Sequence, residues 1–387
     1  MHGARVAYVA FERFPSAKGS GTRIRQMVGG LAGAGCEVDV VTLAGEGDLS
    51  IPGVRLHPIR ILADNYLVRA MRFRSQVARR LQALSPDIIH FRGVFEGEAA
   101  LAHGQSRRIP TVFEVNGLPS VELRYHYAEL ASATAFERRM RDLELRILRG
   151  ARHVITQSQT TARFLEARGL SSDTPAIVIP NAADPDVHGR PVSEECSEQT
   201  LRVLYAGTLT PWQGVPELLM AMRRVLRERD AHLTLAGPAP RRRRKQLERT
   251  IRRLKIGEAV TLTGAIDRPA LAELVRRQDV CVAPLRRDLR NRIQGANPIK
   301  LFEYMCAGRA VLTTDLPCVR EIVEPEHNAV AVHSPRPGRL AEQLLRLGKD
   351  PDLRRRLGDA AHAHVIAHAT WPMRRKALTD CYARWLE

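Results

Sequence analysis

Short apolar runs rich in β-branched residues alternate along the chain with amphipathic stretches that have the spacing of helices. Such alternation is typical of β-α-β units, which build a parallel sheet. Seven runs in the first half predict strands, at residues 5–11, 36–43, 54–59, 87–93, 111–117, 153–158 and 176–181. Six more follow in the second half, at residues 202–209, 232–237, 259–264, 280–285, 310–315 and 329–334. The pattern therefore predicts an α/β protein with two similar doubly wound halves.

A polar stretch without periodicity, AADPDVHGRPVSEECSEQT at residues 182–200, separates the two halves. A chain of 387 residues also exceeds the size at which a single core usually stops growing, about 250–300 residues. We therefore expect one domain over residues 1–185 and a second over residues 200–369. In open parallel sheets ligands bind beyond the carboxyl ends of the strands, so we expect the site in a cleft between the two domains.

Composition excludes several classes of protein. The apolar fraction of 44% and the charged fraction of 26% are those of a soluble globular chain. The first residues, MHGARVAYVAF, contain only a strand-like run, so we expect no secretory signal, no transmembrane helix and a cytoplasmic protein. The six cysteines lie without CxxC or histidine-paired spacing, so we expect reduced thiols and no structural zinc.

The formal net charge of +18, from 60 Lys and Arg against 42 Asp and Glu, is compatible with an anionic partner. The same excess also arises when base composition favours arginine codons. The run RRRRKQLERTIRRLK at residues 241–255 could bind nucleic acid, but no stacking aromatic residues interleave its arginines, so we expect a solvated helix face and no nucleic acid. A second basic helix, at residues 65–84, could lie on anionic lipid, although most helices of this kind cover a sheet.

The loop after the first predicted strand contains two glycines that would let the backbone approach a ligand. Gly19 and Gly21 precede a helix that we expect to begin near Thr22. A dinucleotide fingerprint is not favoured, because Ile24 occupies the place of its third glycine and the second strand ends without an acidic residue. The loop is therefore a candidate contact for a ligand other than NAD.

The second half repeats this arrangement and adds a charged pair. Gly207 follows a predicted strand and Gly214 precedes a predicted helix, where backbone amides and the helix dipole favour an anion. A further helix starts at Asn297, and on it Lys300 and Glu303 lie one turn apart. Such pairs are usually weak surface ion pairs. Because this one lies between two apolar elements, we expect Lys300 to bind the phosphates of a nucleotide diphosphate and Glu303 to accept hydrogen bonds from its ribose.

The chain resembles the retaining glycosyltransferases of family 4, which have the GT-B fold. The resemblance runs over nearly the whole length and depends on the order and spacing of several stretches. These are GSGTRIRQMVGGLAGAGCEVDVVT, VIPNAAD, VLYAGTLTPWQGV, NPIKLFEYMCAGRAVLTTDLPCVREIV and DPDLRRRLGDAAHAHV. The resemblance implies two Rossmann-like domains facing across a cleft, with the acceptor on the first, the donor on the second, and a final helix at residues 370–387 crossing back.

The resemblance also implies roles for single residues. Glu303 would bind the ribose, Lys300 would bind the diphosphate, and residues 19–21 would meet both donor and acceptor. The residues that it places at the donor are Gly207, Thr208, Gln213, Gly214, Asn297, Pro298, Ile299, Lys300 and Glu303. The residues of the loop between donor and acceptor are Gly19, Ser20 and Gly21.

The sequence departs from the family pattern at this expected site. Gly295 stands where the family has the first of two motif glutamates, and Asn116 stands where a histidine is common. Thr208 and Gln213 stand where an arginine and a lysine often bind phosphate. Lys300 is then the main cation for the leaving diphosphate. Three arginines are candidates to assist it: Arg286, Arg287 and Arg292. Variants of this kind occur in the family, so we expect an active enzyme.

The implied reaction needs neither a metal nor a cofactor beyond the nucleotide-sugar co-substrate. No DxD-like metal pair appears where one would be needed, so Lys300 and helix amides would stabilise the charge that develops on the diphosphate. We find no carboxylate placed for a double displacement, and the family's usual mechanism is attack by the acceptor hydroxyl beside the leaving phosphate. Asn116 would orient a sugar hydroxyl, because an amide cannot take up the proton. Lys300 and Asn116 are therefore the predicted catalytic residues.

The acceptor is predicted from acidic residues in the loops of the first domain. Four glutamates could hold a cationic acceptor there: Glu12, Glu96, Glu98 and Glu114. They could instead pair with nearby arginines such as Arg13, Arg92 or Arg124. The sequence resembles transferases of aminoglycoside antibiotic pathways, which implies transfer of a hexose or N-acetylhexosamine from a UDP-sugar to an aminocyclitol such as 2-deoxystreptamine. The alternative is a lipid-linked or polysaccharide acceptor reached through peripheral membrane contact.

Overall fold

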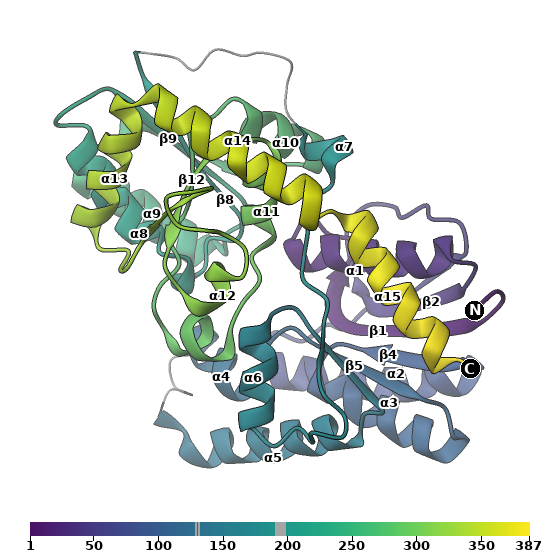
Figure 1. Cartoon of the computed structure of the whole chain (residues 1–387). Coiled ribbons are helices and arrows are strands. Elements are labelled where there is room, and N and C mark those ends of the chain that lie inside the picture. The colour runs from purple at the N-terminus through teal and green to yellow at the C-terminus, as the bar shows by residue number, and fades with distance from the viewer. Residues whose placement is uncertain (128–129, 131, 190–198) are drawn as a thin grey trace. The chain divides into compact units, whose positions relative to one another are not determined.

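The computed structural model describes residues 1–127, 130, 132–189 and 199–387 (Figure 1). The chain forms two compact units, each assembled from more than one segment. Unit 1 comprises Met1–Pro180, Ile293–Ala296 and Pro372–Glu387, and unit 2 comprises Asn181–Arg292 and Asn297–Trp371. The predicted linker contains residues 190–198, and these, with Cys196 among them, lie outside the described residues.

Unit 1 is built on a parallel sheet of seven strands in the order β3-β2-β1-β4-β5-β6-β7. The strands are β1 (Arg5–Phe14), β2 (Glu37–Ala44), β3 (Val54–Ile59), β4 (Ile88–Phe91), β5 (Thr111–Val115), β6 (His153–Thr156) and β7 (Ile177–Val178). Each overlaps a predicted apolar run. Because β1 pairs with β4, the loops that follow these two strands emerge side by side at the carboxyl edge of the sheet.

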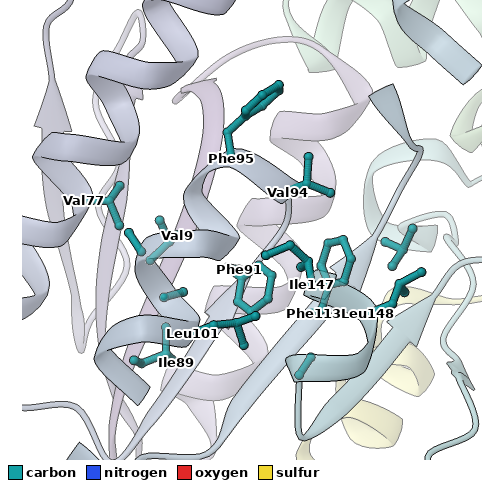
Figure 2. Packing of buried hydrophobic residues seen from close by; sticks show 14 of the residues in the cluster. Val9, Val77, Ile89, Phe91, Val94, Phe95, Leu101, Phe113, Ile147 and Leu148 are labelled. Carbon is teal, nitrogen blue, oxygen red and sulfur yellow. The ribbon is translucent and has the colours of Figure 1, made fainter. Parts of the chain in front are cut away.

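Helices pack against this sheet to form the core of unit 1. They are α1 (Gly19–Gly33), α2 (Tyr66–Ala83), α3 (Val94–Arg107), α4 (Pro119–His126), α5 (Thr134–Gly150), α6 (Gln159–Ala167) and α15 (Trp371–Trp385). Figure 2 shows Phe91 and Phe113 of the strands beside Leu101 of α3 and Ile147 of α5, all buried. A sheet covered by helices favours the near-continuous apolar strands from which the fold was predicted.

Unit 2 is built on a parallel sheet of six strands in the order β10-β9-β8-β11-β12-β13. The strands are β8 (Leu201–Ala206), β9 (Ala231–Ala236), β10 (Val260–Gly264), β11 (Val280–Ala283), β12 (Ala310–Thr314) and β13 (Val330–Val332). The order of the first four strands repeats that of unit 1, with β8 in the place of β1. The predicted fold class, two doubly wound parallel α/β sheets, is confirmed.

The helices of unit 2 vary widely in length. They are α7 (Pro185–His188), α8 (Val215–Val225), α9 (Arg241–Leu254), α10 (Arg268–Arg276), α11 (Ile299–Cys306), α12 (Pro317–Arg320), α13 (Pro337–Lys349) and α14 (Pro351–His368). Helix α9 carries the arginine run and buries only Leu247 and Ile251. In the part of the chain that the structure describes, no helix is long and apolar enough to cross a bilayer.

Two boundaries differ from those predicted. Helix α1 begins at Gly19 instead of near Thr22, because Lys18 already has the extended conformation of the residue before a helix. The first part of the predicted linker is ordered as α7, with Pro185 in its first turn, where a proline is favoured. A β-bridge between Ala183 and Thr370 also ties this segment to unit 2.

Candidate functional site

The carboxyl edge of the unit 2 sheet brings three backbone segments together at glycines. Gly207 and Gly237, which follow β8 and β9, have positive φ angles of 134° and 142°. A Cβ on Gly237 would lie 2.1 Å from the carbonyl oxygen of Gly207. Gly214, before α8, has φ 70°, and a Cβ there would lie 1.8 Å from the carbonyl oxygen of Pro284. Only glycine allows the backbone to approach so closely beside the start of α8.

Lys300, in the first turn of α11, reaches this edge of the sheet. Its Nζ donates a hydrogen bond to Oε1 of Gln213 at 2.9 Å and lies 3.9 Å from the ring centroid of Tyr205. A Cβ on Gly207 would lie 2.7 Å from Nζ, so the glycine makes room for the ammonium. Burial lowers the pKa of Lys300 to about 7, and the nearby Glu303 carboxylate opposes this shift. Among the described residues no carboxylate forms an ion pair with Lys300.

Two further predicted donor residues flank Lys300, and each has a neighbour from the segment after β7. The Glu303 carboxylate lies 3.5 Å from Nε2 of His188. Asn297 accepts a hydrogen bond from the backbone amide of Asn181 at 2.6 Å through its side-chain oxygen. The structure therefore gathers Gln213, Asn297, Lys300 and Glu303 at one edge of unit 2.

A cavity of about 240 Å³, the unit 2 pocket, opens beside Gly237. Its lining is mainly apolar and comprises Leu209, Leu235, Gly237, Pro238, Ala239, Arg244, Leu247, Leu262, Gly264 and Ala265. An apolar pocket at the carboxyl ends of parallel strands suits a flat ring.

A second cavity, the unit 1 pocket of about 310 Å³, lies at the carboxyl ends of β1, β4 and β5. Part of its lining is aromatic: the ring of Tyr66 lies 5.5 Å from that of Phe11 and 6.1 Å from that of Phe95. The polar side chains of the lining are Glu12, Arg92, Glu96, Asn116, Glu122 and His126. A molecule with an apolar ring face and polar edges fits such a pocket.

Glu96 and Asn116 bring unpaired polar atoms to the unit 1 pocket. Oε1 of the buried Glu96 accepts a hydrogen bond from the Phe11 amide at 3.0 Å. Its Oε2, and both polar side-chain atoms of Asn116, have no hydrogen-bond partner within the described part of the chain. Burial raises the pKa of Glu96 to about 7, whereas Glu12 is paired with Arg92 at 2.8 Å. Unpaired buried polar atoms are rare, so these three mark where a bound molecule could hydrogen-bond.

The other two glutamates predicted to bind the acceptor do not line this pocket. Glu114 is fully buried, paired with Arg23, and lies 3.0 Å from Nε2 of His90. These cations hold its pKa well below the usual range despite its burial. Glu98 is paired with Arg74 at 2.5 Å. Because neighbouring cations already satisfy Glu12, Glu98 and Glu114, Glu96 is the remaining acidic candidate.

Comparison with known families assigns both halves of the chain. Residues 17–187 match the family described as Glycosyltransferase Family 4, and residues 192–364 match the one described as Glycosyl transferases group 1. The chain belongs to the family 4 glycosyltransferases. The family resemblance and the enzyme class predicted from the sequence are thereby confirmed.

Solved structures of other proteins share the fold of this one. Sucrose-phosphate synthase from Thermosynechococcus elongatus matches with a TM-score of 0.83 and 21% identity, over 99% of both chains. The Anabaena protein HepE, in complex with UDP and glucose, matches with a TM-score of 0.77 and 14% identity, over 98% of this chain and 100% of HepE. These likenesses confirm the GT-B fold.

Similarity in sequence is more limited. The α-D-kanosaminyltransferase of Streptomyces kanamyceticus is 26% identical over 160 residues, which are 41% of this chain and 39% of that protein. The chain spans less than half the length of each curated relative that it matches.

Two glycine positions of this family 4 glycosyltransferase are explained by the space around them. Gly295, in the place of the family's first motif glutamate, has φ 89°, and a Cβ would lie 2.8 Å from Oγ1 of Thr161. The predicted loop at residues 19–21 forms the first turn of α1, and a Cβ on Gly21 would lie 2.5 Å from the carbonyl oxygen of Ser16. Backbone geometry and contacts therefore disfavour larger residues at both positions.

Two of the three arginines predicted to assist Lys300 have partners of their own. Arg286 is paired with Glu217 at 2.6 Å. Arg287 donates to two backbone carbonyls, at 2.7 and 2.9 Å. Arg292 is exposed on a single turn of π-helix. Lys300 therefore remains our main candidate in unit 2 for the cation that binds the diphosphate.

Sequence reasoning missed several residues of these two sites. Tyr66 and His126 line the unit 1 pocket, and Asn181 and His188 contact the predicted donor residues of unit 2. Asn181 could have been found, because it is the polar residue that ends the predicted apolar run at residues 176–181, which is a usual site signal. His188 gave no such signal, since it lies in a segment that lacks any periodicity.

Proposed function

We propose that this family 4 glycosyltransferase moves a hexose or N-acetylhexosamine from a nucleotide diphosphate sugar to a hydroxyl of a small polar acceptor, with retention at the anomeric carbon. The observation that carries the proposal is Lys300, a half-buried ammonium without an ion-paired carboxylate among the described residues, at the strand ends where anions collect. Such a cation gains more than an exposed one when an anion binds. The solved complex of HepE with UDP supports UDP as the nucleotide.

The donor would occupy the glycine-rich edge of unit 2. Its diphosphate would lie against Gly207, Gly214 and Lys300, and its ribose hydroxyls would donate to Glu303. Its base would enter the unit 2 pocket, whose apolar walls suit a flat ring. As the bond from the sugar to phosphate breaks, negative charge grows on the diphosphate, and preorganised donors stabilise it most where it develops. Lys300 and the first amides of α11 supply this stabilisation in place of a metal.

The acceptor would occupy the unit 1 pocket, and our preferred acceptor is an aminocyclitol such as 2-deoxystreptamine. The unpaired Oε2 of Glu96 suits an ammonium group, and the Asn116 amide suits a neighbouring hydroxyl. A saturated ring can also pack on Tyr66 and Phe95. The likeness to a kanosaminyltransferase supports transfer of a sugar. It does not identify the acceptor, which we infer from the pocket residues alone.

A lipid-linked or polysaccharide acceptor is the second candidate, and one observation favours it. Leu62 is 94% exposed, and Val68 and Met71 at the start of α2 are 43% and 44% exposed. Arg72 donates to the carbonyl of Leu62, so these apolar side chains lie among cations. Such a surface can bind anionic lipid. Co-sedimentation with phosphatidylglycerol vesicles, and none with phosphatidylcholine vesicles, would favour this acceptor class over the aminocyclitol.

A thermal-shift screen tests the proposed donor. UDP, GDP and ADP, alone and as hexose and N-acetylhexosamine conjugates, would be compared with and without a chelator. A ligand that binds only the folded state raises Tm, so we expect the UDP compounds to raise it equally with and without the chelator. Mass spectrometry of a reaction with 2-deoxystreptamine should then detect the glycosylated product. Absence of any shift, with salt-sensitive retention on DNA, would instead favour a nucleic-acid function for α9.

A further inference from the structure

The segment after β7 holds the residue that precedes α11. Asn181 and Asn297 form a reciprocal pair: the Asn181 amide donates to the Asn297 side-chain oxygen at 2.6 Å, and the Asn181 side chain donates to the Asn297 carbonyl at 2.6 Å. Their exposed fractions are 3% and 6%. Two short buried hydrogen bonds fix both the backbone and the side chain of Asn297.

The end of the same segment contacts the carboxylate on α11. His188, 2% exposed in its side chain, places Nε2 3.5 Å from Oε1 of Glu303. Its Nδ1 lies 3.2 Å from the carbonyl oxygen of Asp184 one turn earlier. Each ring nitrogen therefore lies near an oxygen, and the imidazole contacts one side of the Glu303 carboxylate.

The segment is itself anchored to the body of unit 2. The Ala183 amide donates to the Ala369 carbonyl at 3.1 Å, and the Trp371 amide donates to the Ala183 carbonyl at 3.0 Å. Arg276 of α10 donates to the Val187 carbonyl at 2.9 Å. Residues 181–188 are thus fixed at several points and can hold α11 in one position.

We propose that Asn181 and His188 are positioning residues of the donor site, acting through Asn297 and Glu303. The inference rests on the proposed function, because it assumes that these two residues bind the nucleotide diphosphate. Asn181 sets the backbone from which the first turn of α11, with Lys300, begins. His188 keeps the Glu303 carboxylate turned toward the ribose, which reduces the freedom lost when the ribose binds.

The two residues should leave different kinetic signatures. His188 acts on the ribose contact, which does not change during the reaction, so its loss should raise the donor KM and spare kcat. Asn181 acts on the turn that carries Lys300, so its loss should lower kcat as well as raise the donor KM. Neither change should alter the acceptor KM. A purely structural role would instead lower Tm without separating these constants.

The test is isothermal titration of UDP into the full chain, with donor and acceptor kinetics and Tm measured for each variant. His188→Phe keeps the size of the ring and removes both nitrogens, whereas His188→Gln keeps one donor that can reach Glu303. We expect about tenfold weaker UDP binding for His188→Phe and partial recovery for His188→Gln, as for loss and partial return of one polar contact with the Glu303 carboxylate. His362→Phe is the matched control, because His362 hydrogen-bonds the Cys306 carbonyl at the other end of α11.

Asn181→Asp and Asn181→Ala test the other contact, with Asn328→Ala as the control for a buried asparagine elsewhere in unit 2. We expect both Asn181 variants to lose UDP affinity and kcat, and the control to change Tm alone. The positioning role would be overturned if the folded variants, including His188→Phe and Asn181→Asp, bound UDP as tightly as the parent. A parent that binds no nucleotide diphosphate at all would instead overturn the proposed function, and this inference with it.

Discussion

At the scale of the residue, Lys300 is half-buried and no carboxylate forms an ion pair with it among the described residues. Burial lowers its pKa to about 7, so near neutral pH the free enzyme holds a mixture of the charged and neutral forms. A bound diphosphate supplies the missing negative charge and raises this pKa again. We therefore expect the same side chain to serve both binding and departure of the diphosphate.

Replacement of Lys300 and of Glu303 should separate the chemical step from binding. Lys300→Ala removes a contact that strengthens as the bond breaks, so kcat should fall by about 10²–10³, or about 2–4 kcal/mol in the barrier. Glu303→Ala removes a contact with the unchanged ribose and should chiefly raise the donor KM. Steady-state kinetics of both variants measure this. A normal kcat in Lys300→Ala would transfer the role to Arg286, Arg287 or Arg292.

The pH profile should report the Lys300 ammonium. A lysine is charged below its pKa, so kcat/KM for the donor should fall as pH rises through about 7, because this constant reports the free enzyme. The profile of kcat should fall only at higher pH, since the bound diphosphate raises the pKa. Lys300→Ala is the control, and the kcat/KM of its residual activity should not fall as pH rises through about 7. A limb that persists in this variant would belong to another group.

Replacement of Glu96 should affect the acceptor alone. Glu96→Gln keeps the shape of the side chain and removes its charge, so the KM of a cationic acceptor should rise about tenfold while the donor KM stays unchanged. Glu98→Gln is the matched control, because Glu98 is paired with Arg74 and does not line the unit 1 pocket. Equal effects of the two substitutions would argue against the unit 1 pocket as the acceptor site.

At the scale of the element, strands could be predicted from the sequence more reliably than site residues. Buried parallel strands require apolar residues on both faces, which makes β1 and β8 plain in the sequence. The roles of Glu96 and Glu114 could not be told apart, because both follow or end apolar strands and only the fold shows which has cations around it. Helix α7 was missed since four residues are too few to show a helical period.

The turn before α8 provides a prediction at this scale. Gly214 has φ 70° and no space for a Cβ beside the Pro284 carbonyl, so Gly214→Ala should cost about 1–3 kcal/mol of stability. Gly257→Ala is the control, because nothing lies within 4 Å of a Cβ there, and it should change stability by less than about 0.5 kcal/mol. Urea midpoints for the two variants make the comparison. Equal midpoints would show that the turn relaxes.

At the scale of the whole molecule, α15 completes unit 1 from the far end of the sequence. The Tyr382 hydroxyl lies 2.7 Å from Nδ1 of the buried His90, and the ring of Trp385 stacks on that of His153 at 4.2 Å. Figure 1 shows α15 beside α1, where Arg375 covers Gly30. The strands β4 and β6 thus depend on residues more than two hundred positions away.

Loss of this hydrogen bond should weaken unit 1 selectively. Tyr382→Phe leaves a ring nitrogen of His90 unpaired in a buried network, at a cost of about 1–3 kcal/mol. Hydrogen exchange of the β4 amides should accelerate, while exchange in β11 and UDP binding stay unchanged. Faster exchange in both sheets would show that the two units unfold as one. No change in β4 would mean that water or another group satisfies His90.

The chain passes between the two units four times, and this has a consequence for synthesis on the ribosome. Domains generally fold in the order in which they are translated. Here the strands of unit 1 emerge first, yet the helix that supplies Tyr382 is translated only after Trp371, the last residue of unit 2. The nascent unit 1 therefore exposes the surface that α15 will cover, which includes His90 and His153, throughout the translation of unit 2. Unit 1 is thus the first to be translated and the second to be completed. Until α15 is translated, a chaperone that binds apolar surface could bind the surface of unit 1 that α15 later covers.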